Sequence, residues 1–209
     1  MTTKAARRAE QTRRKHLDEI RRVEDAHDRR HRRIRLAAWI GGLAVLASVL
    51  TAMLLTSRPE SSSTTRTAPD FTLTDTSGHR IHLADLRGQN VLLYFSEGAG
   101  CQACLVEMAD IERSAPFAAA GLRVLPIVMN SREQITSDMA ANGVKTPFLL
   151  DDGTVSRAYG TIGKGMHAGL PGHSFVLIDK KGTQQWYGEF PSMWISPSDL
   201  MTEVRKHLA

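Results

Sequence analysis

Cysteine is nearly absent from this chain: the only two in its 209 residues are Cys101 and Cys104. A structural zinc site built from thiolates needs four ligands, usually two cysteine pairs, so the chain has too few cysteines for one. A bridge between residues this close in sequence would constrain the unfolded chain very little, which disfavours a purely structural disulfide. The scarcity of cysteine therefore leaves redox chemistry as the main interpretation of the pair.

The cysteine pair follows an apolar run and precedes a helical pattern. We expect Val91 to Phe95 to be a buried strand that leads into a helix starting near Gln102. A helix N-terminus offers free amide donors and a positive dipole end, which stabilise the thiolate of the first cysteine. The second cysteine, one turn later, is close enough to resolve a mixed disulfide. This spacing predicts Cys101 as the nucleophile and Cys104 as the resolving cysteine.

Charge is absent from residues 36–55, a run of 20 that follows a basic segment. Residues 1–35 carry 13 Lys and Arg against 6 Asp and Glu. The apolar run is long enough for one bilayer-spanning helix, and its basic flank places the N-terminus in the cytoplasm. A cleaved signal peptide is the alternative, but both the basic segment and the apolar run exceed its usual lengths. No cysteine comes directly after the run, which excludes a bacterial-type lipid anchor. We therefore predict a cytoplasmic tail (1–35), a single-pass transmembrane helix (36–55) and an extracytoplasmic cysteine pair.

The rest of the chain divides into a polar linker and one domain. Residues 56–68 are rich in Ser and Thr, cannot bury a core, and predict a flexible tether. Residues 69–209 have the usual size of one domain and carry 12 basic against 15 acidic residues. The basic excess therefore belongs to the tail, where it suits contact with the anionic lipid bilayer. No nucleic-acid partner is expected.

Alternating strand and helix patterns predict an α/β domain with a hydrophobic sheet. Gly182 predicts a hairpin turn between the last two strands, and Gly121 and Gly143 predict helix ends. We expect strands near 71–73, 91–95, 124–128, 148–150, 175–179 and 184–188, and helices near 102–120, 132–142 and 198–208.

Five motifs of this chain, in the order in which the redoxin family has them, resemble that family. The family joins AhpC/TSA (alkyl hydroperoxide reductase/thiol-specific antioxidant) proteins to membrane-tethered thiol-disulfide oxidoreductases. The resemblance covers residues 68–209 and implies a thioredoxin-like fold, a central mixed β-sheet flanked by helices. The motifs are Ala68-Pro69-Asp70-Phe71-Thr72-Leu73, His82-Leu83-Ala84-Asp85-Leu86-Arg87-Gly88, Cys101-x-x-Cys104, Asp151-Asp152-Gly153 with Tyr159-Gly160, and Phe175-Val176-Leu177-Ile178-Asp179.

The resemblance implies a membrane-tethered, extracytoplasmic thiol-disulfide oxidoreductase, with an antioxidant role in cell redox homeostasis. Glu107 matches the active-site acid of the tethered oxidoreductases, although a solvated helix glutamate is an equal alternative. Pro171 is the candidate for the family's cis-proline, one residue further from Phe175 than usual, so an ordinary loop proline is a serious rival. The chain lacks the family's Trp before Cys101 and its Pro before Cys104, which leaves the redox potential open.

Two other functions remain open. Peroxiredoxins place Pro-x-x-x-Thr-x-x-Cys around the peroxidatic cysteine, and neither cysteine of this chain has those residues before it, so any peroxidase activity should be slow. His173, just before a strand, resembles the copper ligand of thioredoxin-fold copper-delivery proteins. Copper would then be held by Cys101, Cys104 and His173, with Met166 and His167 nearby in sequence. The cysteine spacing is one residue shorter than in those proteins, and otherwise His173 would tune the thiolate.

The hypothesis of thiol-disulfide exchange also predicts the partners. The substrates are protein thiols and disulfides outside the membrane, where no cytosolic thiol pool keeps cysteines reduced. The predicted anchor contains no cysteine, so it cannot relay electrons by thiol exchange. A separate membrane electron donor or acceptor is therefore expected. No cofactor is needed beyond the Cys101–Cys104 disulfide, and copper enters only in the alternative.

Overall fold

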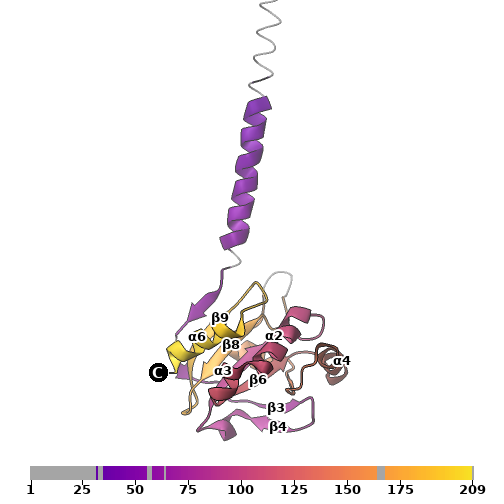
Figure 1. Cartoon of the computed structure of the whole chain (residues 1–209), viewed down its shortest axis with the longest axis vertical. Helices are drawn as coiled ribbons and strands as arrows, with labels where there is room; N and C mark the ends of the chain where they lie inside the picture. The colour runs from indigo at the N-terminus through magenta and orange to yellow at the C-terminus, as the bar shows by residue number, and fades with distance from the viewer. Residues whose placement is uncertain (1–31, 33–34, 56–57, 64, 164–167, 209) are drawn as a thin grey trace, which may run out of the picture. The chain divides into compact units, whose positions relative to one another are not determined.

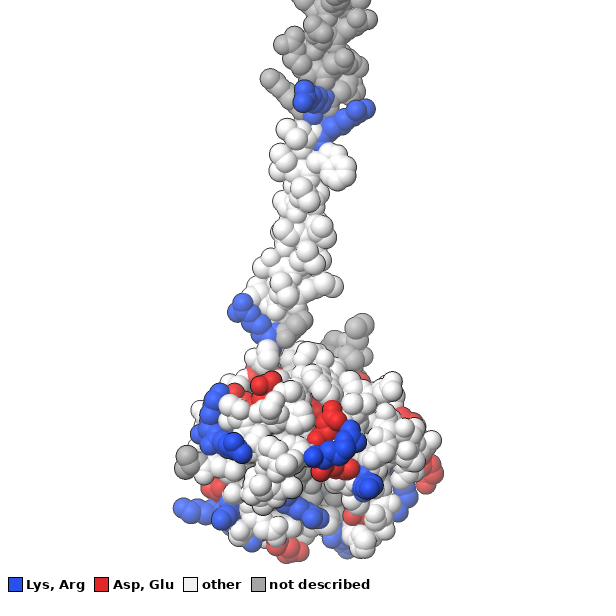
Figure 2. Space-filling view, viewed as in Figure 1, with Lys and Arg blue, Asp and Glu red and all other residues white. Residues whose placement is uncertain are grey.

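The computed structural model describes residues 32, 35–55, 58–63, 65–163 and 168–208. The chain forms two compact units, Met1–Leu55 and Thr56–Ala209. In the first unit, Arg35–Leu55 is a single helix with a mean hydropathy of 2.1, and none of it is buried. Its surface carries no charged side chain between its ends (Figure 2). The helix is long and apolar enough to cross a membrane. The predicted cytoplasmic tail lies almost wholly outside the described residues.

The second unit alternates short strands and helices along the chain. Its strands are β1 (Glu60–Ser62), β2 (Arg66–Thr67), β3 (Thr72–Asp75), β4 (Arg80–His82), β5 (Asn90–Phe95), β6 (Leu122–Val128), β7 (Leu149–Leu150), β8 (Ser174–Ile178) and β9 (Thr183–Glu189). Its helices are the 3-10 helix η1 (Leu83–Leu86) and the α-helices α2 (Gln102–Arg113), α3 (Ala115–Ala119), α4 (Arg132–Asn142), α5 (Thr154–Tyr159) and α6 (Pro197–His207).

The strands form one mixed sheet in the order β1-β9-β8-β5-β6-β7-β3-β4, with β2 also paired to β9. The central strand β5 pairs parallel with β6 and antiparallel with β8. The parallel β5–β6 pair requires a crossover connection, which α2 and α3 provide. Figure 1 shows α2, α3 and α6 lying across one face of the sheet. The predicted mixed sheet flanked by helices is therefore present.

Burial of β5 on both faces explains its uninterrupted apolar sequence. Leu92 and Tyr94 point into a core shared with α2, α4 and α6. Val91, Leu93 and Phe95 point into a second core, which α5 and η1 cover. The sheet therefore holds the end of β5, and the segment that follows it, between two packed layers.

The polar linker differs from the predicted flexible tether. Glu60–Ser62 and Arg66–Thr67 are strands that pair antiparallel with β9. Strand pairing uses backbone groups, so exposed Ser and Thr side chains can extend a sheet edge without a core of their own. The prediction of a flexible tether is wrong for these residues.

Most of the predicted elements are present, with two differences. The helix expected over 102–120 is two helices, because α2 ends at Arg113 and α3 begins at Ala115 with Pro116 in its first turn. The sequence patterns do not predict the short elements β4, η1 and α5. Gly143 ends α4 in a left-handed conformation, and Gly182 has a φ of 81° in the β8–β9 hairpin, as expected.

Candidate functional site

The two cysteines form a disulfide at the start of α2. Cys101 is the N-cap residue of the helix, and its sulfur accepts a hydrogen bond from the backbone N–H of Cys104 at 3.4 Å. Cys101 is partly exposed, whereas Cys104 is 1% exposed. Because only the outer sulfur is accessible, a partner thiol or disulfide can react at Cys101 while Cys104 stays beneath it. The assignment of Cys101 as the nucleophile and Cys104 as the resolving cysteine stays a prediction, which this difference in exposure favours.

A fully buried acid–base pair lies beneath the inner sulfur. The Glu107 carboxylate, one turn after Cys104, comes within 2.8 Å of Nε2 of His173, and neither side chain is exposed. The approach allows charge pairing, although the ring N–H is not aligned with the carboxylate oxygen. The other ring nitrogen, Nδ1, lies 3.9 Å from the Cys104 sulfur. The structure thus brings together Cys101, Cys104, Glu107 and His173, and the solvated alternative for Glu107 does not apply.

Tyr94 is a site residue that the sequence did not reveal. Its hydroxyl lies 3.1 Å from the Cys104 carbonyl oxygen, 3.2 Å from Oε2 of Glu107 and 3.4 Å from Nδ1 of His173. Burial raises the pKa of Tyr94 well above its ordinary value of 10.0, and the charge of Glu107 raises it further. The hydroxyl therefore keeps its proton and serves as a hydrogen-bond donor. A tyrosine inside an apolar strand gives no sequence signal that separates this role from ordinary packing.

Side chains from the β6–α4 loop and from α4 hold the loop that precedes Cys101. The amide of Ala99 donates to the Asn130 side chain, and the amide of Gly100 donates to the Asp138 carboxylate, both at 2.9 Å. Gly98 has a φ of 71°, and a Cβ there would collide with Asn130 and Val128. These contacts place a carboxylate one residue from the reactive cysteine. Asn130 and Asp138 carry no motif, and only the fold brings them to the site.

Glu107 also fixes the segment between β9 and α6. Its second oxygen, Oε1, accepts a hydrogen bond from the backbone N–H of Ile195 at 3.1 Å. The chain just before Ile195 therefore runs close to α2. Like Tyr94, this contact involves no recognisable motif.

Pro171 stands two residues before His173 in the chain, and it lacks the family's cis geometry. All peptide bonds among the described residues are trans. Pro171 is buried and forms an antiparallel bridge with Ile162. This bridge fixes the strand-like entry to β8, two residues before His173.

The donor set for copper is incomplete in this disulfide state. Among the described residues, no group of three or more His, Cys, Asp or Glu side chains has the spacing of a metal site. His173 faces Cys104 with one nitrogen, while the other faces Glu107. Met166 and His167 lie outside the described residues.

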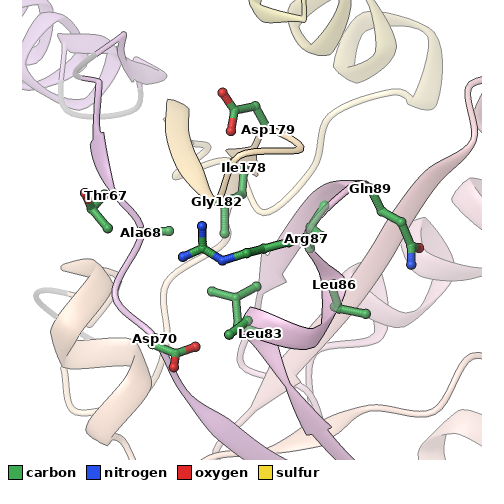
Figure 3. A pocket seen from close by; sticks show the side chains of 12 residues that line it. Thr67, Ala68, Asp70, Leu83, Leu86, Arg87, Gln89, Ile178, Asp179 and Gly182 are labelled. Atoms are coloured by element: carbon green, nitrogen blue, oxygen red, sulfur yellow. The ribbon is translucent and has the colours of Figure 1, made fainter.

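A small hollow of about 110 Å³ lies at the opposite end of the sheet (Figure 3). It is lined by the residues before β5 and by the β8–β9 hairpin. Its polar groups are used within the fold: Arg87 donates to the carbonyl of Lys181, and Asp179 accepts from the amides of Lys181 and Thr183. These contacts stabilise the hairpin, and the hollow carries no further catalytic group.

Comparison with known proteins points to one family. The family model described as the AhpC/TSA family matches residues 64–186. The chain is 36% identical over 103 residues to the thiol-disulfide oxidoreductase ResA of Bacillus subtilis, covering 48% of this chain and 57% of ResA. It is 35% identical over 99 residues to a Mycobacterium tuberculosis protein named as a peroxiredoxin, covering 46% of this chain and 63% of that protein. The chain therefore spans less than two thirds of either relative.

Solved structures show the same fold. The peroxidoxin BcpB of M. tuberculosis superposes with a TM-score of 0.56 at 19% identity, covering 70% of this chain and 99% of that one. A secreted disulfide oxidoreductase of the same organism gives a TM-score of 0.52 at 22% identity, covering 65% and 95%. The predicted thioredoxin-like fold is thus confirmed. The relatives carry both activities, disulfide exchange and peroxide reduction, so the choice between them depends on the site.

Proposed function

Because this chain belongs to the AhpC/TSA family, we propose that its redox site serves thiol-disulfide exchange with partner proteins rather than peroxide reduction. The observation that carries the proposal is the pairing of a partly exposed Cys101 with a buried Cys104 at the N-terminus of α2. An accessible sulfur joined to an inaccessible one suits a reaction in which a partner is first bound and then released.

In the reducing direction, the exchange has two steps. The Cys101 thiolate attacks one sulfur of a partner disulfide, so that the partner's S–S bond breaks, a Cys101–partner bond forms, and the partner's other sulfur leaves as a thiolate. The Cys104 thiolate then attacks Cys101, which closes the internal disulfide and releases the partner's first sulfur. Two electrons pass from the chain to the partner. The same steps in reverse oxidise a dithiol partner.

The buried pair of Glu107 and His173 supplies the proton transfer for the second step. Cys104 must lose its proton before it attacks, yet it has no access to solvent. His173 is the nearest base, with Nδ1 at 3.9 Å from the sulfur, and the Glu107 carboxylate lies on its other side, 2.8 Å from Nε2. Tyr94 donates a hydrogen bond within the same pocket. Together they allow a buried thiol to react at neutral pH.

The peroxidase alternative is less well supported by the residues around the sulfurs. The positions that peroxiredoxins fill with Pro and Thr are Tyr94 and Gly98 when counted from Cys101. The Tyr94 hydroxyl is directed at Cys104 and Glu107, and Gly98 has no side chain to orient a peroxide. We therefore expect only slow reaction with peroxides. Copper delivery through Cys101, Cys104 and His173 has no observation in its favour beyond the approach of His173 to Cys104.

The proposed setting is the outer side of a cell membrane. The Arg35–Leu55 helix would anchor the chain, with the basic tail in the cytoplasm and the redox unit outside. The partners would be protein thiols or disulfides in that compartment. A separate membrane protein would supply electrons to the redox unit of this chain or accept electrons from it. ResA, a relative named as a thiol-disulfide oxidoreductase, supports the exchange activity in this proposal.

The test is to trap the mixed disulfide. Cys104→Ser removes the resolving thiol, so the reduced variant should accumulate covalent adducts with its partners in native membranes, visible as bands that disappear on reduction. Cys101→Ser should give no such adducts, because its remaining cysteine is buried. If Cys104→Ser gave no adduct while hydrogen peroxide rapidly oxidised the wild-type dithiol, the exchange function would be wrong and peroxidase activity would replace it.

A further inference from the structure

Ser96 carries a buried hydroxyl that the disulfide form of the protein does not use. The residue directly follows β5 and is 0% exposed. Its Oγ is shielded from solvent and has no hydrogen-bond partner among the described residues. Burying a hydroxyl without a partner is unfavourable, and alanine would fill the same space without that cost. An unpartnered hydroxyl inside a native fold therefore needs an explanation.

The strand register places Ser96 beside the redox centre. Phe95, the last residue of β5, pairs with Ser174 of β8. The next residues outward, Ser96 and His173, therefore stand opposite each other, and residues opposed in this way have Cβ atoms about 4.5–5.5 Å apart. Because side chains alternate along a strand, Ser96 also points to the same face as Tyr94, which is the face that packs against α2.

The Tyr94 hydroxyl connects Ser96 to the inner cysteine. Burial and then the charge of Glu107 raise the pKa of Tyr94, whereas the Ser96 side chain acts in the opposite direction, as a nearby donor would. The same hydroxyl lies 3.1 Å from the Cys104 carbonyl oxygen and 3.4 Å from Nδ1 of His173. Ser96 thus faces Tyr94, although its approach falls short of a hydrogen bond in the disulfide form.

The surroundings of Tyr94 change when the disulfide opens. Its single O–H faces three acceptors, the Cys104 carbonyl, the Glu107 carboxylate and the His173 imidazole, while its oxygen can itself accept a hydrogen bond. Reduction adds a fourth acceptor, the freed Cys104 sulfur, which lies 3.9 Å from His173. Consecutive hydrogen bonds strengthen one another, so a donor to the Tyr94 oxygen makes Tyr94 a better donor to that sulfur.

We propose that Ser96 is a positioning residue for the reduced form: once the disulfide opens, its hydroxyl donates to the Tyr94 oxygen and directs the Tyr94 proton to the Cys104 sulfur. The inference rests on the proposed function and adds a residue to the same site. Ser96 stabilises the dithiol and not the disulfide, so it makes the chain easier to reduce. The competing explanations are ordinary packing and a buried water bound to Ser96, and both would act alike in the two redox forms.

The test measures the redox equilibrium of the full chain in lipid nanodiscs. The chain is equilibrated with glutathione, so that one dithiol and one glutathione disulfide convert into the internal disulfide and two glutathione thiols. Alkylation followed by mass measurement gives the fraction of each form. Ser96→Ala removes the hydroxyl and little volume. Ser174→Ala is the matched control, because this neighbouring serine is equally buried and its Oγ already donates to the Gly172 carbonyl at 3.3 Å.

We expect Ser96→Ala to shift the equilibrium about tenfold toward the disulfide, the size expected for loss of a hydrogen bond that supports a charged group. For a two-electron couple this is a potential about 30 mV more negative. Ser174→Ala should leave the equilibrium unchanged. Thermal unfolding gives a second readout, in which Ser96→Ala should lower the melting temperature of the reduced chain only. Equal lowering in both forms, with an unchanged equilibrium, would assign Ser96 to packing or to a bound water and overturn the proposal.

A double-mutant cycle tests the route through Tyr94. In a Tyr94→Phe background, Ser96→Ala should have no further effect on the equilibrium, because the link to Cys104 is already removed. A full tenfold effect in that background would overturn the positioning role. If the wild-type dithiol failed to attack a peptide joined by a disulfide to thionitrobenzoate, whose release is coloured, the exchange function itself would fail. The failure of the inference and the failure of the proposed function can therefore be told apart.

Discussion

Two acidic residues lie near the disulfide and act on different sulfurs. Glu107 is fully buried and reaches His173, which faces Cys104. Asp138 is partly exposed and binds the amide of Gly100, next to Cys101. A carboxylate that assists proton transfer and one that opposes thiolate formation should give separate signatures when each is neutralised.

Glu107→Gln should slow the release of the partner without slowing its capture. The amide keeps an oxygen for the Ile195 amide but replaces the buried carboxylate that lies 2.8 Å from Nε2 of His173, so the proton relay that begins at Cys104 is interrupted beyond the imidazole. Interrupting general-base catalysis lowers rates by about 10²-fold or more. Rapid mixing with a thionitrobenzoate peptide measures capture by colour and resolution by the decay of the adduct. Resolution by the variant should recover as pH rises, since hydroxide can replace the base. An unchanged resolution rate would remove Glu107 from the mechanism.

Asp138→Asn should lower the pKa of the Cys101 thiol. The amide can still accept from Gly100, but the negative charge next to the residue that precedes Cys101 is gone, so the reduced thiol should ionise more readily. The rate of alkylation of the reduced chain as a function of pH measures this. The same variant should be easier to reduce, because its thiolate is more stable. Asp110→Asn, an exposed carboxylate near the far end of α2, is the control and should shift neither quantity.

At the scale of elements, the sequence indicated the framework of the site better than its interior. The apolar strand β5 and the cysteine pair at the start of α2 follow from patterns within a few residues. The roles of Tyr94 and Asp138 could not be predicted, because a strand tyrosine resembles core packing and a helix aspartate resembles a solvated face. Burial of Glu107 was undecided for the same reason. Only the pairing of β8 with β5, which brings His173 next to Tyr94 and Glu107, and the placement of α4, which brings Asp138, assemble these side chains at the disulfide.

The structure of the linker could not be predicted from the sequence either. Its Ser and Thr residues predict flexibility, because they cannot form a core, yet β1 and β2 pair with β9 through their backbones. Trp186 of β9 donates a hydrogen bond to Ser61 of β1 at 2.8 Å. Edge pairing depends on a partner far away in sequence, so composition alone does not reveal it.

The entry to β3 and the end of β4 are joined by a pH-sensitive contact. His82 lies 2.8 Å from Asp70 and 3.3 Å from Asp85. Its hydrogen bond with Asp70, aided by the negative charges of both aspartates, raises the pKa of His82 above 6.5. A raised folded-state pKa means that the contribution to stability is fully present below about pH 6.5 and is lost as the pH rises through the folded-state value.

His82→Asn should therefore destabilise the globular unit in mildly acidic solution and have little effect in alkaline solution. Thermal unfolding of wild type and variant, followed from pH 5.5 to 9 in steps of about half a unit, should give melting temperatures that differ at the acidic end and converge at the alkaline end. His79→Asn is a suitable control on the neighbouring turn. A difference that grew with pH would contradict the sign of the contact.

For the whole molecule, the location of the redox unit depends on whether the Arg35–Leu55 helix is kept as a membrane anchor or cleaved off as a signal peptide. At 1.5 Å per residue its 21 residues extend about 30 Å, the thickness of the hydrocarbon core of a bilayer. The basic excess before the helix favours a cytoplasmic N-terminus and an external redox unit. Retention of the helix would keep the disulfide at the membrane, where an electron donor or acceptor embedded in the bilayer can reach it.

We predict that the mature chain keeps its full mass of 23.1 kDa, stays in the membrane fraction after alkaline carbonate extraction, and exposes its cysteines to the outside. In reduced cells with intact membranes, a membrane-impermeant thiol reagent should label Cys101. Since the chain has no other cysteine than the redox pair, Cys101→Ser is a direct control for this label. A shortened soluble chain would identify the helix as a cleaved signal, whereas labelling only after membrane disruption would place the redox unit in the cytoplasm. The cytoplasmic result would also remove the reason to expect a membrane electron partner, because exchange could then take place with cytosolic thiols.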